Sequence, residues 1–229
     1  HKKRIGVIRG GPSSEYEISL NTGKFVLQNL QEMGEYEPVD IFVSKSGVWH
    51  EYGYEKPPER IVKKLDGVWN AMHGAYGEDG TLQTVLEGLG TPYTGSGALA
   101  SSAGMNKILT KNLFNKFGIK TPSFLVINKE ESIHDAVDKV FNGLPFPVII
   151  KPANSGSSLG VSVVTNRSQI ADALHRAFVY SPNVIAEEFV SGREATCGVI
   201  DDFRGERVYE LLPIEVIVPK NRTFYDFRA

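Results

Sequence analysis

A lysine followed by a loop of small residues is the most informative segment of the chain. An apolar run at 148–150 ends at Lys151, and residues 152–160 read Pro-Ala-Asn-Ser-Gly-Ser-Ser-Leu-Gly. Consecutive backbone N–H groups without bulky side chains can fold over phosphate oxygens, while a lysine supplies a compact positive charge. The loop leads into another apolar run, at 161–164, so it matches neither a Walker A sequence nor a dinucleotide fingerprint. A phosphate-binding loop and a plain hairpin with a solvated Lys151 both fit this pattern.

Paired carboxylates follow a second apolar run. Glu187 and Glu188 come after Val184-Ile185-Ala186, and Glu194 follows a few residues later. A carboxylate at the edge of a strand can accept hydrogen bonds from an adenine amino group or from ribose hydroxyls. An exposed acidic strand end is the alternative interpretation, and this segment taken alone does not exclude it.

Two polar side chains in the first half of the chain follow predicted strands. Glu15 comes after the glycine turn at 10–14, where the first turn of a helix would lie on the ligand side of a doubly wound sheet. An acidic residue there is also a common partner of the helix dipole. His73 follows the apolar run at 67–72 and begins a segment with three glycines and an acidic pair. A histidine in such a loop favours a role in a site.

Apolar periodicity predicts the elements that hold these residues. Runs at 3–8, 38–43 and 67–72 read as buried parallel strands, with helices over 16–33 and from Thr81 to Gly90. The helical stripe over 16–33 contains Ile18, Phe25, Val26, Leu30 and Met33. This alternation predicts a Rossmann-like α/β domain that extends to about Gly97.

The second half of the chain begins with a stretch rich in Ser, Gly and Ala, from Gly95 to Gly104, whose composition is typical of a hinge. An alternation of helices and strands then predicts a small α+β unit, and only strands are predicted from Asn183 onward. We therefore expect three parts: 1–97, Rossmann-like; 98–183, a small subdomain with the phosphate loop; and 184–229, the start of a further subdomain.

Composition limits the classes of function. The 229 residues carry a formal net charge of -2 and no basic block, which argues against a nucleic-acid partner. No apolar run reaches the ~18 residues that a membrane span needs. A single cysteine, Cys197, excludes an internal disulfide and fits a reducing compartment. We expect a cytoplasmic protein in which Cys197, flanked by apolar residues, is buried and unreactive.

Four ordered segments together resemble the D-alanine–D-alanine ligases of the ATP-grasp superfamily. They are Gly10-Gly11-x-Ser13-x-Glu15, His73-Gly74-x-x-Gly77-Glu78-Asp79-Gly80, Tyr93-Thr94-Gly95-Ser96-Gly97 and Lys151-Pro152-x-x-x-Gly156-Ser157-Ser158-x-Gly160. The resemblance covers the whole chain and ends at 223–226, which is similar to the start of that family's mobile loop. It implies a Rossmann-like (pre-ATP-grasp) domain followed by an α+β ATP-grasp domain.

The resemblance also implies the chemistry. ATP phosphorylates the carboxylate of one D-alanine, and the amine of a second D-alanine attacks the acyl phosphate, giving a peptidoglycan precursor. Glu15 would hold the ammonium of the first D-alanine, and His73 would lie beside that substrate. Ser157 would anchor the hydrogen bonds that connect Glu15 to the mobile loop, so Glu15 and Ser157 are the expected catalytic residues. The family also implies Mg²⁺ and a homodimer formed through the N-terminal domain.

The nucleotide residues that the resemblance implies lie in both halves of the chain. They are Lys107, Lys151, Ser157, Ser158, Leu159, Gly160, Glu187, Glu188, Val190 and Glu194. The two lysines would contact phosphates and the loop would cover them. Glu187 and Glu194 would face adenine and ribose, and Val190 would bind adenine through its backbone. Glu188 stands where the family often has lysine, and Lys107 also fits a solvated helix face that includes Lys111 and Lys116.

One departure from the family bears on activity. The family's Glu-x-Asn segment, which holds two magnesium ions, does not occur in these 229 residues. We therefore expect no metal ligands here, an ATP-grasp domain that is incomplete at its C-terminus, and a chain that by itself binds ATP without ligating. A catalytically incomplete ATP-binding fragment and a ligase that takes D-lactate or D-serine second are the alternatives. A NAD-dependent dehydrogenase is disfavoured because no Gly-x-Gly-x-x-Gly turn follows Ile8.

Overall fold

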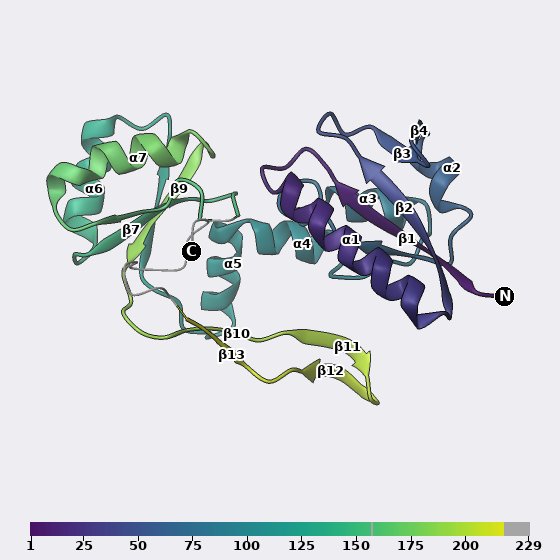
Figure 1. Ribbon diagram of the computed structural model, residues 1–229. Coiled ribbons are helices and arrows are strands. Elements are labelled where there is room, and N and C mark those ends of the chain that lie inside the picture. Colours follow the sequence, from purple (N-terminus) through teal and green to yellow (C-terminus); the bar gives the residue numbers. More distant parts are fainter. Residues whose placement is uncertain (157, 218–229) are drawn as a thin grey trace. The chain divides into compact units, whose positions relative to one another are not determined.

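A computed structural model describes residues 1–156 and 158–217 (Figure 1). The chain divides into two compact units, each described by itself below. The first contains residues 1–121 together with 153–156, and the second contains 122–152 and the described residues from 158 onward. The three-part division proposed from the sequence stays a prediction.

The first unit is built on a five-stranded sheet. Its strands are β1 (Lys3–Gly10), β2 (Tyr36–Val43), β3 (Trp49–Glu51), β4 (Tyr54–Glu55) and β5 (Gly67–Asn70), in the order β4-β3-β2-β1-β5. β2 and β5 both run parallel to β1, whereas β3 and β4 continue the sheet as antiparallel strands. The predicted Rossmann-like α/β architecture is confirmed.

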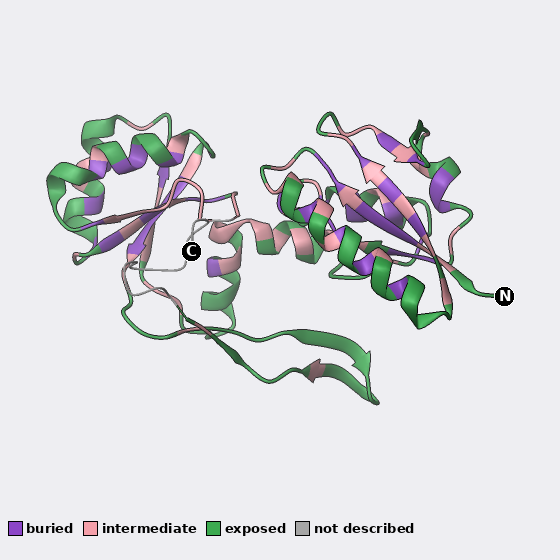
Figure 2. Ribbon diagram, in the orientation of Figure 1, coloured by how far each residue is buried: buried purple, intermediate pink, exposed green. Residues whose placement is uncertain are grey.

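Helices cover both faces of this sheet (Figures 1 and 2). α1 (Tyr16–Met33) packs on one face, and α2 (Pro58–Val62) and α3 (Thr81–Gly88) pack on the other. α4 (Ala98–Met105) and α5 (Lys107–Lys116) follow α3 in the chain. Neighbouring residues of β1 point to opposite faces, so Val7 packs in the cluster with Leu30 of α1 and Ile8 in the cluster with Leu86 of α3. Burial of each such side chain contributes ~1.5–3 kcal/mol relative to exposure.

Most of the stretch Gly95–Gly104 forms α4 rather than an irregular linker, and its role as a hinge stays a prediction. The side chain of Glu87, on α3, accepts hydrogen bonds from Ala98 N at 2.9 Å and from the Tyr93 hydroxyl at 2.6 Å. A carboxylate at the first turn of a helix satisfies a free N–H group and interacts favourably with the helix dipole. Local composition could not reveal this stabilisation, because Glu87 comes from another helix.

The second unit contains a four-stranded antiparallel sheet with two helices. β6 (Phe124–Asn128), β7 (Val148–Pro152), β8 (Ser162–Val164) and β9 (Asn183–Glu188) lie in the order β6-β9-β7-β8. α6 (Ile133–Gly143) and α7 (Ile170–Phe178), the latter preceded by a 3₁₀ turn, η1 (Arg167–Gln169), share one buried cluster with the sheet (Figure 2). This is the expected α+β ATP-grasp arrangement.

Two ribbons follow β9 in the chain. β10 (Glu194–Thr196) pairs with β13 (Ile214–Val216), and β11 (Val199–Phe203) pairs with β12 (Glu206–Glu210). Cys197, predicted to be buried, is exposed, and its thiol lies 3.1 Å from Leu211 O. The prediction is wrong because, within the part of the chain that the structure describes, these two-stranded ribbons leave their apolar side chains exposed.

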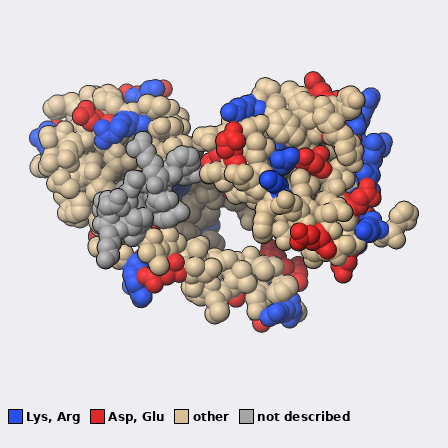
Figure 3. Space-filling model, viewed as in Figure 1, with Lys and Arg blue, Asp and Glu red and all other residues tan. Residues whose placement is uncertain are grey.

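The charged surface agrees with the composition. Figure 3 shows acidic and basic side chains interspersed on the face in view. Among the described residues, the helices are too short or too polar to cross a membrane.

Candidate active site

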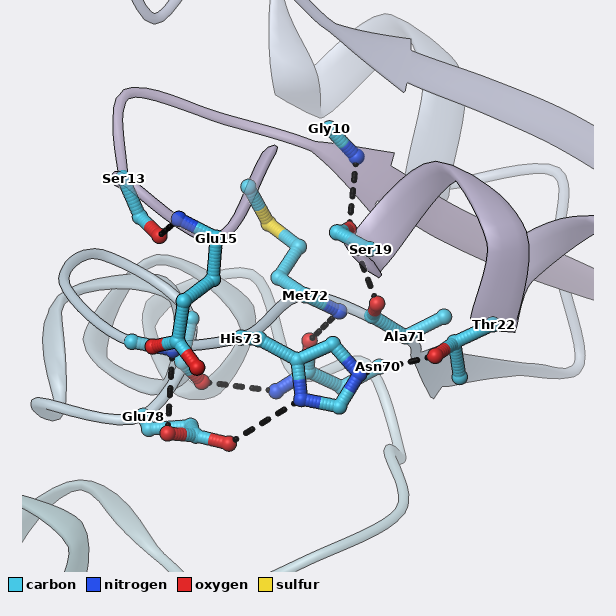
Figure 4. A network of polar contacts seen from close by, with 12 residues as sticks. Gly10, Ser13, Glu15, Ser19, Thr22, Asn70, Ala71, Met72, His73 and Glu78 are labelled. Carbon is cyan, nitrogen blue, oxygen red and sulfur yellow. Dashed lines mark hydrogen bonds and ion pairs between the residues drawn. The ribbon is translucent and has the colours of Figure 1, made fainter. Parts of the chain in front are cut away.

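Glu15 lies at the N-terminal end of α1, immediately before Tyr16. Its backbone N–H donates to Ser13 Oγ at 2.8 Å, and its carboxylate does not cap the helix. The carboxylate instead extends toward the loop that carries His73 and Glu78 (Figure 4). The geometry therefore does not support the alternative that Glu15 is simply a helix cap.

Two glycines leave room for this carboxylate. A Cβ atom on Gly74 would lie 2.5 Å from Glu15 Oε2, and Gly74 has a φ of +71°, which favours glycine. A Cβ atom on Gly156 would lie 3.4 Å from the same oxygen. The position of the Glu15 carboxylate therefore depends on glycines in two segments that are distant in sequence, because a side chain at either position would crowd it.

His73 is oriented by contacts at both ring nitrogens (Figure 4). Nε2 lies 2.8 Å from Thr22 Oγ1, and Nδ1 lies 3.5 Å from Glu78 Oε1. The second carboxylate oxygen of Glu78 accepts from Gly74 N at 2.9 Å. The hydrogen bond to Glu78 raises the pKa of His73, and this effect outweighs the opposite effect of burial. The negative charge of Glu15 raises the pKa of His73 by a smaller amount. The same hydrogen bond lowers the pKa of Glu78.

This ion pair predicts a pH window of highest stability. Because folding raises the pKa of His73 above 6.5, the contribution of His73 to the free energy of unfolding is complete below pH 6.5 and is lost as the pH rises through the folded-state pKa. Because folding lowers the pKa of Glu78 below 4.5, its contribution is complete above pH 4.5 and is lost as the pH falls through the folded-state pKa.

We expect the urea midpoint of the wild-type protein to exceed that of Glu78→Gln most clearly between about pH 4.5 and 6.5. Urea denaturation of both proteins from pH 4 to 9 measures this difference. A difference that does not change between pH 5 and pH 9 would contradict the assignment of the pair.

Internal hydrogen bonds hold the loop that carries His73 and Glu78. The side-chain amides of Asn70 and Gln83 both donate to Gly77 O, at 2.7 and 2.8 Å. Asp79 accepts from Tyr76 N at 2.9 Å and closes the next turn. The loop is therefore a rigid support for its two ionisable side chains.

Lys107 contacts the first part of the glycine loop, which belongs to the same unit. Its backbone N–H donates to Ala153 O at 3.0 Å, and its side-chain amine donates to Ser155 O. Lys111, proposed to share a solvated helix face with it, is only 6% exposed and donates to Thr121 Oγ1. The solvated-face interpretation is therefore wrong for Lys111, and Lys107 lies against the loop.

A cavity of about 680 Å³ adjoins these residues within the first unit. Its walls include His73, Glu78, Lys107, Ser155 and Gly156. A pair of opposite charges on one wall and a lysine amine on another suit a small ligand that carries both an ammonium and an anionic group.

Lys151 and Glu187 form an ion pair in the second unit. The two side chains come from the adjacent antiparallel strands β7 and β9 and are 22% and 7% exposed, respectively. Lys151 is therefore not the solvated lysine of a plain hairpin. Its amine and the Glu187 carboxylate lie together at the strand that precedes the loop.

Residues 158–160 of the glycine loop lead to β8 through tight backbone. Gly160 has a φ of +72°, and a Cβ atom there would lie 2.7 Å from the Tyr180 ring and 3.0 Å from Pro152. Ser158 also has a positive φ, of 55°, and its carbonyl accepts from Val161 N at 3.3 Å. Ser157, the expected catalytic serine, lies outside the described residues, as do residues 223–226.

The remaining expected nucleotide residues lie at and after the end of β9. Glu188 N donates to Ser123 O at 3.0 Å, Val190 is 63% exposed, and Glu194 begins β10. Their nucleotide contacts, like those of Leu159, stay predictions.

Comparison with known proteins identifies the family. The family described as "D-ala D-ala ligase C-terminus" matches residues 113–229, and "D-ala D-ala ligase N-terminus" matches residues 53–96. The D-alanine--D-alanine ligase of Syntrophotalea carbinolica is 38% identical over 229 residues, which cover 100% of this chain and 67% of that protein. The chain belongs to the D-alanine–D-alanine ligase family.

Other relatives and solved structures of this ligase family agree. The D-alanine--D-alanine ligase of Geobacter sulfurreducens is 39% identical, and the match covers 99% of this chain but 65% of that protein. D-alanyl-alanine synthetase A from Vibrio cholerae matches with a TM-score of 0.81 and 29% identity, over 99% of this chain and 70% of that one. The VanG D-Ala:D-Ser ligase from Enterococcus faecalis also has a TM-score of 0.81 and 29% identity, over 94% and 70% of the chains. The chain thus spans about two thirds of the length of these ligases.

Two contributors to this candidate site were not assigned from the sequence. Glu78 lies within the recognised His73–Gly80 segment, so its acidic type next to a glycine was an available signal. Thr22 lies on a helix with no motif around it, and only the fold brings its hydroxyl to His73.

The magnesium ions implied for the ligase family are typically held by one or two carboxylates together with substrate phosphates. Within residues 1–156 and 158–217, no group of three or more His, Cys, Asp or Glu side chains could hold a metal ion.

Proposed function

We propose that the protein containing this chain joins two D-alanine molecules to D-alanyl-D-alanine and converts ATP to ADP and phosphate. The observation that carries this proposal is the Glu15 carboxylate beside Gly74 and Gly156, next to the His73–Glu78 pair. A carboxylate in that setting is suited to bind the ammonium of an amino acid, because a charge-assisted hydrogen bond is stronger than a neutral one.

The reaction would proceed in two balanced steps. A carboxylate oxygen of the first D-alanine attacks the γ-phosphorus of ATP, which forms an acyl phosphate and releases ADP. The amine of the second D-alanine then attacks the acyl carbon, a proton leaves the nitrogen, and phosphate departs with its bonding electrons. Both steps depend mainly on positioned charge.

The proposed roles of the residues follow their contacts. Glu15 binds the first ammonium, and His73, held by Thr22 and Glu78, borders that substrate. Lys107 is proposed to offer its amine to a phosphate, since it already lies against the loop at Ser155.

In the second unit, Lys151 is proposed to bind phosphates, and the segment 157–160 to cover them. Glu187, Glu188, Val190 and Glu194 are proposed to border the adenosine. The structure of the Bacillus anthracis ligase, 32% identical with a TM-score of 0.74, is described as complexed with ATP, which supports ATP as the nucleotide.

The proposal includes Mg²⁺, a homodimer and a cytoplasmic location. The exposed apolar side chains of Ile18, Phe25 and Met33 on α1 support a subunit contact through the first unit. Sedimentation of the purified protein over a concentration series would test the dimer.

A product assay on the protein that contains this chain, rather than on these 229 residues alone, tests the function. With ATP and Mg²⁺, addition of D-alanine is expected to release phosphate and to yield D-alanyl-D-alanine, identified by mass spectrometry. L-alanine is the matched control and should give neither product. Equal amounts of D-alanine and D-serine, or D-alanine and D-lactate, distinguish the alternative ligases by product mass. Absence of any D-alanine-dependent phosphate release would reject the proposal.

A further inference from the structure

Gln83 is a buried residue whose contacts point to the candidate site. It lies on α3, is 3% exposed, and its Nε2 donates to Gly77 O at 2.8 Å. Asn70 Nδ2 donates to the same oxygen at 2.7 Å. Because a carbonyl oxygen only accepts, each amide must present its nitrogen to Gly77. Two side chains from different elements therefore hold one carbonyl group.

The other half of the Gln83 amide indicates why glutamine is present. Its Oε1 is buried and has no hydrogen-bond partner among the described residues. An unsatisfied buried acceptor is unfavourable, and an apolar side chain of similar size would avoid that cost. Packing alone therefore does not explain a glutamine here, whereas the bond to Gly77 does.

The held carbonyl belongs to the residue immediately before Glu78. Gly77 also packs closely against Met72, since a Cβ atom on Gly77 would lie 2.4 Å from Met72 Cβ. Glu78 contacts Gly74 N through one carboxylate oxygen and His73 through the other. A shift at Gly77 would therefore move the carboxylate that orients the histidine.

We propose that Gln83 is a positioning residue, which fixes the Gly77 carbonyl and thereby sets the distance between Glu78 and His73. The expected effect of Gln83 on kcat/KM for D-alanine rests on the proposed ligase function, whereas its expected effect on the titration of His73 does not. The groups that face the His73 ring are the carboxylates of Glu78 and Glu15 and the hydroxyl of Thr22.

The first test compares the wild-type protein with Gln83→Met, which keeps side-chain size and removes the donor. We expect the pKa of His73, followed by NMR titration of the ring, to fall toward 6.5. The melting temperature should change by no more than about 4 °C, because the lost bond is offset by removal of the unsatisfied oxygen. We also expect kcat/KM for D-alanine to fall by about tenfold with the KM for ATP unchanged.

Thr84→Val is the matched control. Thr84 is the next residue on α3, and its hydroxyl donates to Gly80 O at 2.7 Å rather than to Gly77. Like Gln83→Met, this variant loses one side-chain-to-carbonyl hydrogen bond, but it should leave the titration of His73 unchanged. A His73 pKa that is the same in Gln83→Met and in the wild-type protein would overturn the proposal.

A double-mutant cycle shows whether Gln83 acts through Glu78. In a Glu78→Gln background, Gln83→Met is expected to have no further effect on the His73 titration. A shift of the same size in both backgrounds would overturn the proposed route. If Gln83→Met does not fold, Asn70→Ser removes the other donor to Gly77 and should shift the histidine in the same direction. If D-alanine is not a substrate, the ligase proposal fails while the titration still tests this one.

Discussion

Gly74→Ala is expected to lower kcat/KM for D-alanine by about 100-fold, which corresponds to about 2.7 kcal/mol of lost transition-state stabilisation. The added Cβ atom would lie 2.5 Å from Glu15 Oε2 and 3.0 Å from Ser13 Oγ, so the carboxylate proposed to bind the ammonium must move. Steady-state kinetics with D-alanine measure the loss, and calorimetric binding of ATP should remain close to that of the wild-type protein.

Gly34→Ala separates crowding from backbone strain. Gly34 has nearly the same φ, +72°, but a Cβ atom there would meet nothing within 4 Å. Both variants therefore have a similar left-handed strain of ~1–2 kcal/mol, and only the change at Gly74 crowds Glu15. Equal kinetic losses in the two variants would show that strain, rather than the position of Glu15, limits activity.

Lys151→Met is expected to have the largest effect in the second unit, on both stability and nucleotide binding. The substitution leaves the carboxylate of Glu187, which is 7% exposed, without its lysine. Breaking a buried ion pair costs ~3–5 kcal/mol, and we expect the lower end because Lys151 is partly exposed. Urea denaturation measures the change, and the Kd for ATP should rise more than about tenfold if Lys151 binds phosphate.

Two further variants separate these roles of Lys151. The double variant Lys151→Met/Glu187→Gln removes both charges, so it should recover most of the lost stability but none of the lost ATP affinity. Lys139→Met is the control, because its pair with Glu131 is 41% and 32% exposed and should contribute no more than ~1 kcal/mol. Recovery of ATP affinity in the double variant would contradict phosphate binding by Lys151.

The positions of several candidate residues could be predicted because they depend on local order. Glu15, His73 and Lys151 each follow an apolar run, and the chain must leave a sheet where such a run ends. The parallel strands and the helix over 16–33 followed from alternation and spacing in the same way. The apolar stripe of that helix was less informative, since Val26 and Leu30 are buried whereas Phe25 is 66% exposed.

What the sequence by itself determined is the family, the order of the elements and the residue types that reach the ends of the strands. The tertiary structure alone decided which of them meet. The Lys151–Glu187 pair exists because β7 and β9 are neighbours in the sheet, although the two residues are 36 positions apart. The same holds for Thr22 with His73, for Glu87 at the start of α4, and for Gln83 at Gly77. Each of these contacts depends on how elements pack, and short-range periodicity records only which side of an element is apolar.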